Sequence, residues 1–213
     1  MTPSNALRQI AFYRGRRDEV PNQELARALA EAEDVEGIAE IAANLRSDTP
    51  AVQSDCVKVL YEIGYLKPGL IAPYASEFMR LLGGRNNRLV WGGMIALATI
   101  STLRAAEIWA HIEDVLTALE HGSLITVVWG IRTLAGVASV LPASHARILP
   151  VLAAQLERCD PRDLPLHAES VLPAIGSSTR GTFAAILQDR MPELTPAQAR
   201  RLRKVLRQIE GVR

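Results

Sequence analysis

The side chains that could do chemistry are scattered through this 213-residue sequence. None of the four histidines has metal-ligand spacing or a cysteine pair beside it; they are His111, His121, His145 and His167. No serine or cysteine lies in a recognisable nucleophile motif, and the paired glycines at 83–84 and 92–93 are not in a strand-to-helix turn that could hold phosphate. We therefore predict no catalytic residue, no metal site and no cofactor. An acid–base pair assembled from distant segments stays open.

Hydrophobic residues recur every 37 positions along most of the chain. The repeating positions are Ile41, Phe78, Val115 and Leu152, then Leu45, Leu82, Leu119 and Leu156, and then Leu60, Leu97 and Leu134. The last series continues at Leu172 and Leu206 with intervals of 38 and 34. Two helical registers within one repeat of this length predict stacked helical hairpins, which form an α-solenoid.

Each repeat is expected to contain a first helix (A) and a second helix (B). The predicted A helices are Val35–Leu45, Gly69–Leu82, Ala105–Glu120, Ser144–Glu157 and Ser178–Arg190. The predicted B helices are Pro50–Ile63, Asn87–Thr102, Ser123–Val140, Pro161–Ile175 and Pro196–Ile209. A further helix from about residue 23 to residue 32 would cap the stack. Glycines and Thr-Pro pairs at the expected helix ends support these boundaries.

One B helix carries a family resemblance. The segment Asp48-Thr-Pro50-Ala-Val52-Gln-Ser-Asp-Cys56, which continues through Leu60 and Ile63 to Gly64, resembles a HEAT repeat. That family's second helix reads Asp-x-Pro-x-Val-Arg, then Ala, Leu, Ile or Val, and Gly, whereas Gln53 and Cys56 depart from it here. The resemblance covers residues 34 to 210. It implies an all-α, right-handed α-solenoid of about five HEAT-like hairpins. Residues 1–33 would be an N-terminal helical cap and connector, and residues 34–213 the repeats.

The B helices of such stacks usually line the concave side. If the repeating apolar positions form the core, the solvent-side positions of the second and third B helices are unexpectedly apolar. We predict a hydrophobic patch with charged edges, formed by Trp91, Ile95, Val128 and Trp129 with Lys58, Arg88, Arg132 and His167. Exposed apolar patches that contain tryptophan and arginine usually mark partner sites. Burial of both helices within the stack and self-association through this face stay open as alternatives.

We accordingly predict a non-catalytic scaffold that binds a peptide or protein in its concave groove. Trp91 and Trp129 would supply aromatic contact area, while Arg88, Arg132 and Lys58 would either orient the partner or hold an acidic group of it. The alternative is nucleic-acid binding. Some bacterial HEAT-like proteins are alkylpurine DNA glycosylases, and this groove resembles theirs in its tryptophans and arginines. No aspartate lies beside the two tryptophans, which is a departure from those enzymes.

Charge and composition exclude several classes of partner. The formal net charge is +1, so indiscriminate attraction to nucleic acid or anionic membrane is not expected. Basic residues gather in an N-terminal arm at 14–17 and in the last predicted helix at 200–207. We find no secretory signal and no apolar run long enough to cross a bilayer. Two cysteines far apart in sequence favour a reducing, cytoplasmic compartment.

Overall fold

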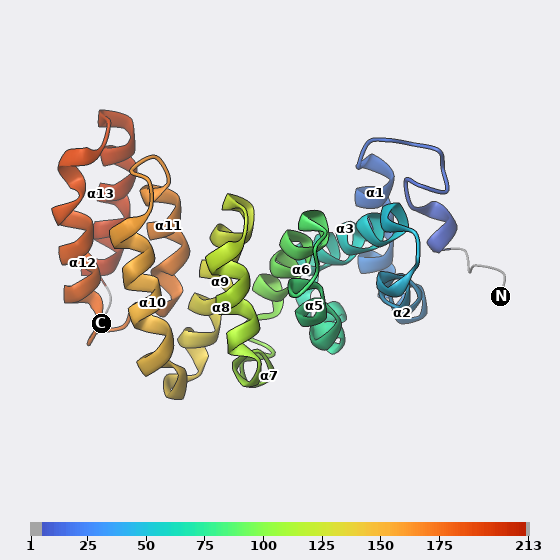
Figure 1. Ribbon diagram of the computed structural model, residues 1–213, viewed down its shortest axis with the longest axis horizontal. Coiled ribbons are helices and arrows are strands. Elements are labelled where there is room, and N and C mark those ends of the chain that lie inside the picture. The colour runs from blue at the N-terminus through green and yellow to red at the C-terminus, as the bar shows by residue number, and fades with distance from the viewer. Residues whose placement is uncertain (1–5, 212–213) are drawn as a thin grey trace. The chain divides into compact units, whose positions relative to one another are not determined.

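The computed structural model describes residues 6–211, and every regular element in that range is a helix (Figure 1). The predicted all-α class is therefore confirmed. The chain divides into two compact units, residues 1–130 and residues 131–213, with the boundary inside one helix. Each unit is described by itself.

The helices of unit 1 follow one another closely along the chain. They are η1 (Leu7–Gln9), α1 (Val20–Ala32), α2 (Val35–Ala43), η2 (Asn44–Arg46), α3 (Pro50–Leu66), α4 (Pro68–Ile71), η3 (Ala72–Tyr74), α5 (Ala75–Leu82), α6 (Asn87–Ile100), α7 (Ala105–Ala110), α8 (Ile112–His121) and the first turns of α9 (Leu124–Val140). Unit 2 holds the rest of α9, η4 (Pro142–Ser144), α10 (His145–Arg158), α11 (Leu164–Val171), η5 (Leu172–Ala174), α12 (Arg180–Asp189), η6 (Met191–Glu193) and α13 (Pro196–Glu210).

Within each unit the helices stack as hairpins. In unit 1, α5 packs against α6, and the second helices α3 and α6 pack on each other, as do the first helices α5 and α8. In unit 2, α12 packs against α13, while α10 packs on α12 and α11 packs on α13. Like helices of successive hairpins thus lie side by side, which is the arrangement of a repeat stack.

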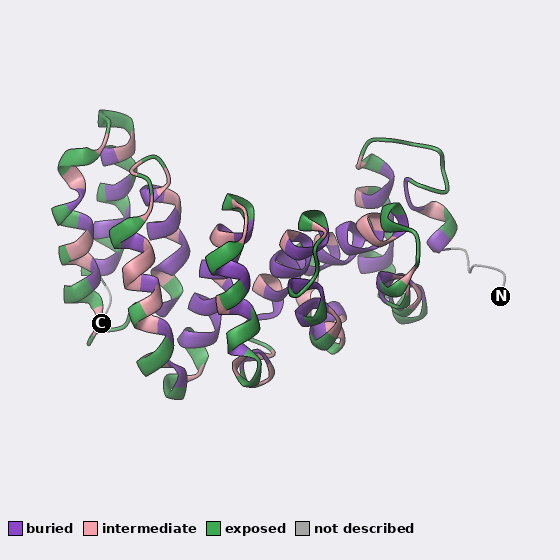
Figure 2. Ribbon diagram, viewed as in Figure 1, coloured by how far each residue is buried: buried purple, intermediate pink, exposed green. Residues whose placement is uncertain are grey.

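The repeating apolar positions form the core, as predicted (Figure 2). Ile41, Phe78, Val115 and Leu152 are all fully buried. Leu60, Leu97 and Leu134 are also 0% exposed, although they come from the second helices. Both helices of a hairpin therefore direct a regular apolar stripe inward, and the burial of this surface is the main source of stability.

Two of the predicted first helices are interrupted in the structure, so their prediction as continuous helices was wrong. The segment 69–82 is divided by the short turn η3, where Pro73 has no N–H to donate and its ring would clash with the carbonyl of an α-helical turn. The segment 105–120 is interrupted at His111, whose backbone has φ −118° and ψ 28°. The second helix predicted at 161–175 is also shorter, because residues 161–163 form a turn in which the Asp160 carboxylate accepts the N–H of Arg162.

Candidate functional site

The predicted site residues divide between the two units. Lys58, Arg88, Trp91, Ile95, Val128 and Trp129 belong to unit 1, and Arg132 and His167 belong to unit 2. Within unit 1, the residues come from three consecutive second helices, α3, α6 and α9.

Two residues predicted to form an exposed apolar floor are buried instead. Ile95 is 5% exposed and Val128 is 7% exposed, so neither offers contact area to a partner. On the α6 side, this helix packs closely against α3. A Cβ atom on Gly92 would lie only 2.9 Å from Val57 Cγ1, so a larger residue at position 92 would force α3 or the Val57 side chain to shift. The 37-residue periodicity does not reveal that approach, so this face was expected to be open.

Four aromatic rings form a chain of contacts across the second helices of unit 1. The ring of Tyr61 lies 6.2 Å from the ring of Trp91 and 5.8 Å from the ring of Tyr65. The ring of Tyr65 in turn lies 5.7 Å from the ring of Trp129. These separations are in the range where aromatic pairs attract each other. We call the set of Tyr61, Tyr65, Trp91 and Trp129 the aromatic ladder.

The ladder is partly open to solvent. Tyr61 is 4% exposed, so its ring is the buried member of the set. Tyr65 is 46% exposed, and both Trp91 and Trp129 are half-buried. The two tryptophans were predicted from the sequence, whereas both tyrosines were missed. Their i, i+4 spacing at the end of α3 was the signal that could have found them, because it places both rings on one side of the helix.

A network of charges lies beside the ladder. Lys58 Nζ is 2.8 Å from one carboxylate oxygen of Glu19 and 2.7 Å from Glu62, and it lies 4.8 Å from the centre of the Tyr61 ring. The other oxygen of Glu19 lies 3.0 Å from a guanidinium nitrogen of Arg88. Burial by itself would lower the pKa of Lys58, but the hydrogen bonds to Glu19 and Glu62 raise that pKa well above its ordinary value. The two carboxylates therefore favour the charged form of this buried side chain.

This arrangement corrects the prediction that Lys58 lies on the solvent side at the edge of a groove. Only 8% of its side chain is exposed, and its ammonium group is already held between two carboxylates. Arg88 remains accessible, with 46% of its side chain exposed. The correction arises because Glu19 comes from a segment far away in the sequence, which a pattern internal to the repeat does not predict.

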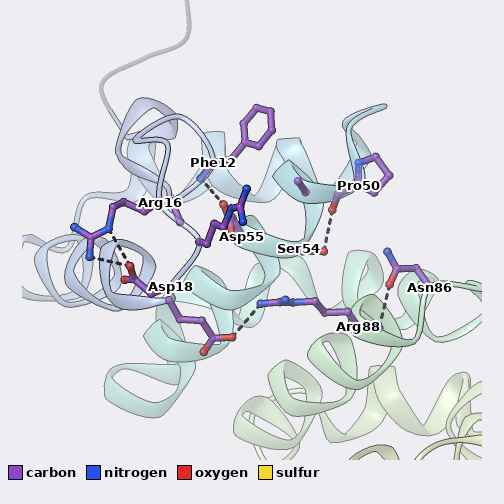
Figure 3. A pocket seen from close by; sticks show the side chains of 12 residues that line it. Phe12, Arg16, Asp18, Pro50, Ser54, Asp55, Asn86 and Arg88 are labelled. Carbon is purple, nitrogen blue, oxygen red and sulfur yellow. Dashed lines mark hydrogen bonds and ion pairs between the residues drawn. The ribbon is translucent and has the colours of Figure 1, made fainter.

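A cavity of about 340 Å³ lies where the N-terminal segment meets the start of α3 and α6 (Figure 3). The segment is attached by polar contacts. The Asp55 carboxylate accepts the N–H of Phe12 at 2.7 Å and the side-chain amide of Asn22 at 2.8 Å, and Asn22 accepts the N–H of Ala11. The N-terminal arginines are therefore not simply a free arm. Arg16, for example, pairs with Asp18, and this contact lowers the pKa of that carboxyl group.

In unit 2, the two remaining predicted residues lie in the interior or make internal contacts. His167 is 2% exposed, and neither ring nitrogen has a hydrogen-bond partner among the described residues, so it is not an edge of an open groove. Burial lowers the pKa of His167. Arg132 is half-buried, and its Nε donates to the hydroxyl of Ser170 at 3.2 Å. The packing of α11 against its neighbours in unit 2 explains the burial of His167.

Residues 6–211 contain no group of three or more histidine, cysteine, aspartate or glutamate side chains placed to hold a metal ion. In the same range, no helix combines the length and the apolar character that crossing a membrane requires. Cys56 is fully buried, and this burial raises the pKa of its thiol. A buried thiol of this kind packs as a small apolar side chain.

The sequence matches no protein-family model and no curated protein. In its fold, the chain is similar to an engineered protein that was a target of the Northeast Structural Genomics Consortium, with 19% identity, a TM-score of 0.64 and 97% of each chain covered. It is also similar to a designed armadillo repeat protein, with 10% identity, a TM-score of 0.65, and 98% of this chain and 100% of the other covered. A second designed armadillo repeat protein, in complex with the peptide (KR)4, has 12% identity, a TM-score of 0.66 and the same coverage. At such identities the likeness concerns the fold alone, and it shows that the chain is an all-α solenoid of helical repeats.

Proposed function

We propose that this protein is a non-catalytic scaffold that holds a peptide segment of another protein against the aromatic ladder of unit 1. The observation that carries the proposal is the run of four contacting rings over three second helices, with Tyr65, Trp91 and Trp129 partly exposed. Half-exposed tryptophan and tyrosine rings offer a large contact area at a low cost in conformational entropy. A rigid row of such rings suits a partner that extends across several repeats.

The structural comparisons give further support to this proposal. A designed armadillo repeat protein of similar fold is in complex with the peptide (KR)4, so a stack of this kind accommodates a peptide.

We also propose that the repeats are of the HEAT type, because the second helix α3 has the HEAT-like pattern from Asp48 to Gly64. We further propose a cytoplasmic location, since both cysteines are free.

The test is a selection of peptides from a random displayed library against the full chain. Selected peptides are then measured against Trp91→Ala and Trp129→Ala, with Trp109→Ala as the control. Trp109 is also half-buried, but it lies on α7 and takes no part in the ladder. We expect each ladder substitution to weaken binding by about 2 kcal/mol or more, and the control to bind as the unchanged protein does.

Light scattering of the unchanged protein accompanies this test. A dimer that the ladder substitutions dissociate would show that the ladder is a subunit interface, and would contradict the scaffold. Peptides that bind all three variants equally would also contradict it.

A nucleic-acid partner is the second candidate, and the exposed face of α13 favours it. Four cations share that face at i, i+3, i+4 and i+7, and none of them makes an ion pair within residues 6–211: Arg200, Arg203, Lys204 and Arg207. The neighbouring Arg201 instead pairs with Glu169. The opposite side of α13 is buried, so this face has no apolar surface to insert into a bilayer. A row of three arginines and one lysine is well suited to contact successive phosphates.

Fluorescence anisotropy of labelled duplex DNA and RNA at several salt concentrations tests this candidate. Binding through α13 predicts an affinity that falls steeply with salt, and a salt slope that becomes shallower when Arg203 and Arg207 are replaced by glutamine. Absence of binding near physiological salt would eliminate the nucleic-acid candidate and leave the peptide scaffold in place.

A further inference from the structure

We infer that Lys58 and Arg88 form a receptor for a carboxylate of the bound peptide, and that Glu19 occupies this receptor as an internal competitor. The inference rests on the proposed function, because it places the receptor at one end of the aromatic ladder. Its first support is geometric. The two oxygens of Glu19 are divided between two cations, at 2.8 Å from Lys58 Nζ and 3.0 Å from Arg88 Nη2. The structure thus shows one carboxylate seated between these cations.

The position of Glu19 at the start of α1 is the second support. Glu19 is the residue that precedes the first turn of this helix, where short polar side chains normally accept a backbone N–H. The Glu19 side chain makes no such cap and reaches α3 and α6 instead. The contact with Lys58 and Arg88 is therefore the hydrogen-bonding role that its carboxylate has in this structure.

The solvent exposure of Glu19 and Arg88 allows a peptide carboxylate to replace the carboxylate of Glu19. The side chain of Glu19 is 43% exposed and that of Arg88 is 46% exposed, so a second carboxylate has access to the receptor from solvent. Lys58 is almost fully buried, but it keeps its ion pair with Glu62 when Glu19 leaves. Displacement therefore breaks a solvent-accessible contact and leaves no buried charge unpaired, which keeps its cost small.

The receptor adjoins the ladder directly. Lys58 lies over the ring of Tyr61, and that ring contacts Trp91. Arg88 is three residues before Trp91, almost one turn away on the same helix. The cavity beside Glu19 is also lined by Arg17, which makes no ion pair within the described range and adds a positive charge. A peptide that lies on the ladder and carries an aspartate or glutamate side chain matches these charges.

The experiment uses three labelled decapeptides with blocked ends, in which leucine alternates with glutamate, with glutamine or with lysine. Blocked ends ensure that only side-chain carboxylates are tested. Binding is measured by fluorescence anisotropy to the unchanged protein and to Glu19→Gln, which keeps the shape of the side chain. Asp18→Asn is the matched control, because it removes one negative charge from the same segment without touching the receptor.

Replacement of the competing carboxylate by a neutral amide is expected to tighten binding of the glutamate peptide by about fivefold or more, because an amide competes more weakly for the two cations. Affinity for the glutamine and lysine peptides, and the effect of Asp18→Asn, should stay within about twofold of the starting values. Replacing Arg88 by glutamine in the Glu19→Gln background should reverse the gain.

The inference is overturned if Glu19→Gln binds the glutamate peptide no more tightly than the unchanged protein, or if it binds no peptide. Different binding results would show that the proposed function, rather than this inference, is incorrect. Binding of the glutamate peptide to Glu19→Gln that is unaffected by Trp129→Ala would support the carboxylate receptor and contradict the ladder as the peptide-binding surface. Loss of binding in Trp129→Ala, with no gain in Glu19→Gln, would support the ladder and contradict the receptor.

Discussion

The rings of Tyr65 and Trp129 meet at a centroid distance of 5.7 Å and an interplanar angle of 41°. Tyr65 lies near the end of α3 and Trp129 lies in the first half of α9, two second helices that are separated in sequence by α6. Trp91 of α6 reaches the same set of rings through Tyr61. This contact joins Trp129 to the other three rings, and Tyr65 is the most exposed member of the ladder.

Substitution of Tyr65 distinguishes a role in peptide binding from a role in the stability of the fold. Tyr65→Ala removes the more exposed of the two inner rings of the ladder, so we expect peptide binding to weaken by about 1–2 kcal/mol. Because the side chain is 46% exposed, the free energy of unfolding should fall by no more than about 1 kcal/mol. Tyr65→Phe is the control, since it keeps the ring. Anisotropy titration and urea unfolding give the two quantities, and a loss of stability without a loss of affinity would mean that Tyr65 only supports the fold.

The close packing of α5 and α6 predicts a sharp difference between two glycines. A Cβ atom on Gly93 would lie 2.9 Å from the backbone carbonyl of Phe78, which has little freedom to move. Gly93→Ala should therefore destabilise the protein by about 1–3 kcal/mol. Gly69 lies in α4, and a Cβ atom there would meet no atom of residues 6–211 within 4 Å apart from its own helical turn, so Gly69→Ala should leave stability unchanged or raise it by up to about 1 kcal/mol. Equal unfolding midpoints in urea for the two variants would contradict this packing.

Two lysines with different surroundings test the buried charge network. Lys58→Met removes the charged hydrogen bonds of a buried ammonium group to Glu19 and Glu62, and should cost about 2 kcal/mol of stability. Lys67→Met removes an exposed pair with Glu33 and should cost less than about 0.5 kcal/mol. Chemical unfolding measures both, and addition of Glu19→Gln should restore part of the stability lost in Lys58→Met. Similar losses in the two lysine variants would show that Lys58 is not held as described.

His167 predicts a dependence of stability on pH. Burial favours its neutral form and lowers its pKa in the folded state, while the unfolded chain has the ordinary value near 6.5. The unfolded state therefore takes up the proton first, and the contribution of His167 is complete above about pH 6.5 and is lost as the pH falls below it. Asp163 is the charged group that opposes this shift.

His167→Leu serves as the comparison, because leucine fills the apolar site and does not titrate. Urea unfolding followed by circular dichroism at several pH values between 8 and 5 gives the free energy of unfolding for both proteins. The difference between them should change with pH by up to about 1.4 kcal/mol per pH unit in the acidic part of this range. Parallel curves would show that His167 is accessible or hydrogen-bonded in solution.

The sequence pattern predicted the fold well because the buried apolar residues recur at regular intervals along the chain. Residues such as Phe78 and Leu97 recur at a constant interval, and the structure places them in the core. Pro73 is a signal for the first break, although α10 continues through Pro150, whereas the break at His111 has no such signal in its residue type. Fold class thus follows from a periodic property of the chain.

The site was only partly predictable because its contacts join segments outside the repeat. Trp91 and Trp129 were identified from their residue type and position. Ile95 was placed on an open face because the approach that Gly92 permits between α3 and α6 depends on their packing. The state of Lys58 depends on Glu19, which precedes the repeats and follows no periodic pattern.

The most direct test of the peptide-binding ladder is a titration of the protein with a selected peptide, followed by nuclear magnetic resonance of the indole N–H groups. The chain has three tryptophans, so three signals report on three known positions, and single Trp substitutions assign them. We predict that the signals of Trp91 and Trp129 shift together with the same dissociation constant, while the signal of Trp109 stays in place. A shift of Trp109 alone, or saturation by the peptide with no change at Trp91 and Trp129, would contradict the ladder as the binding surface.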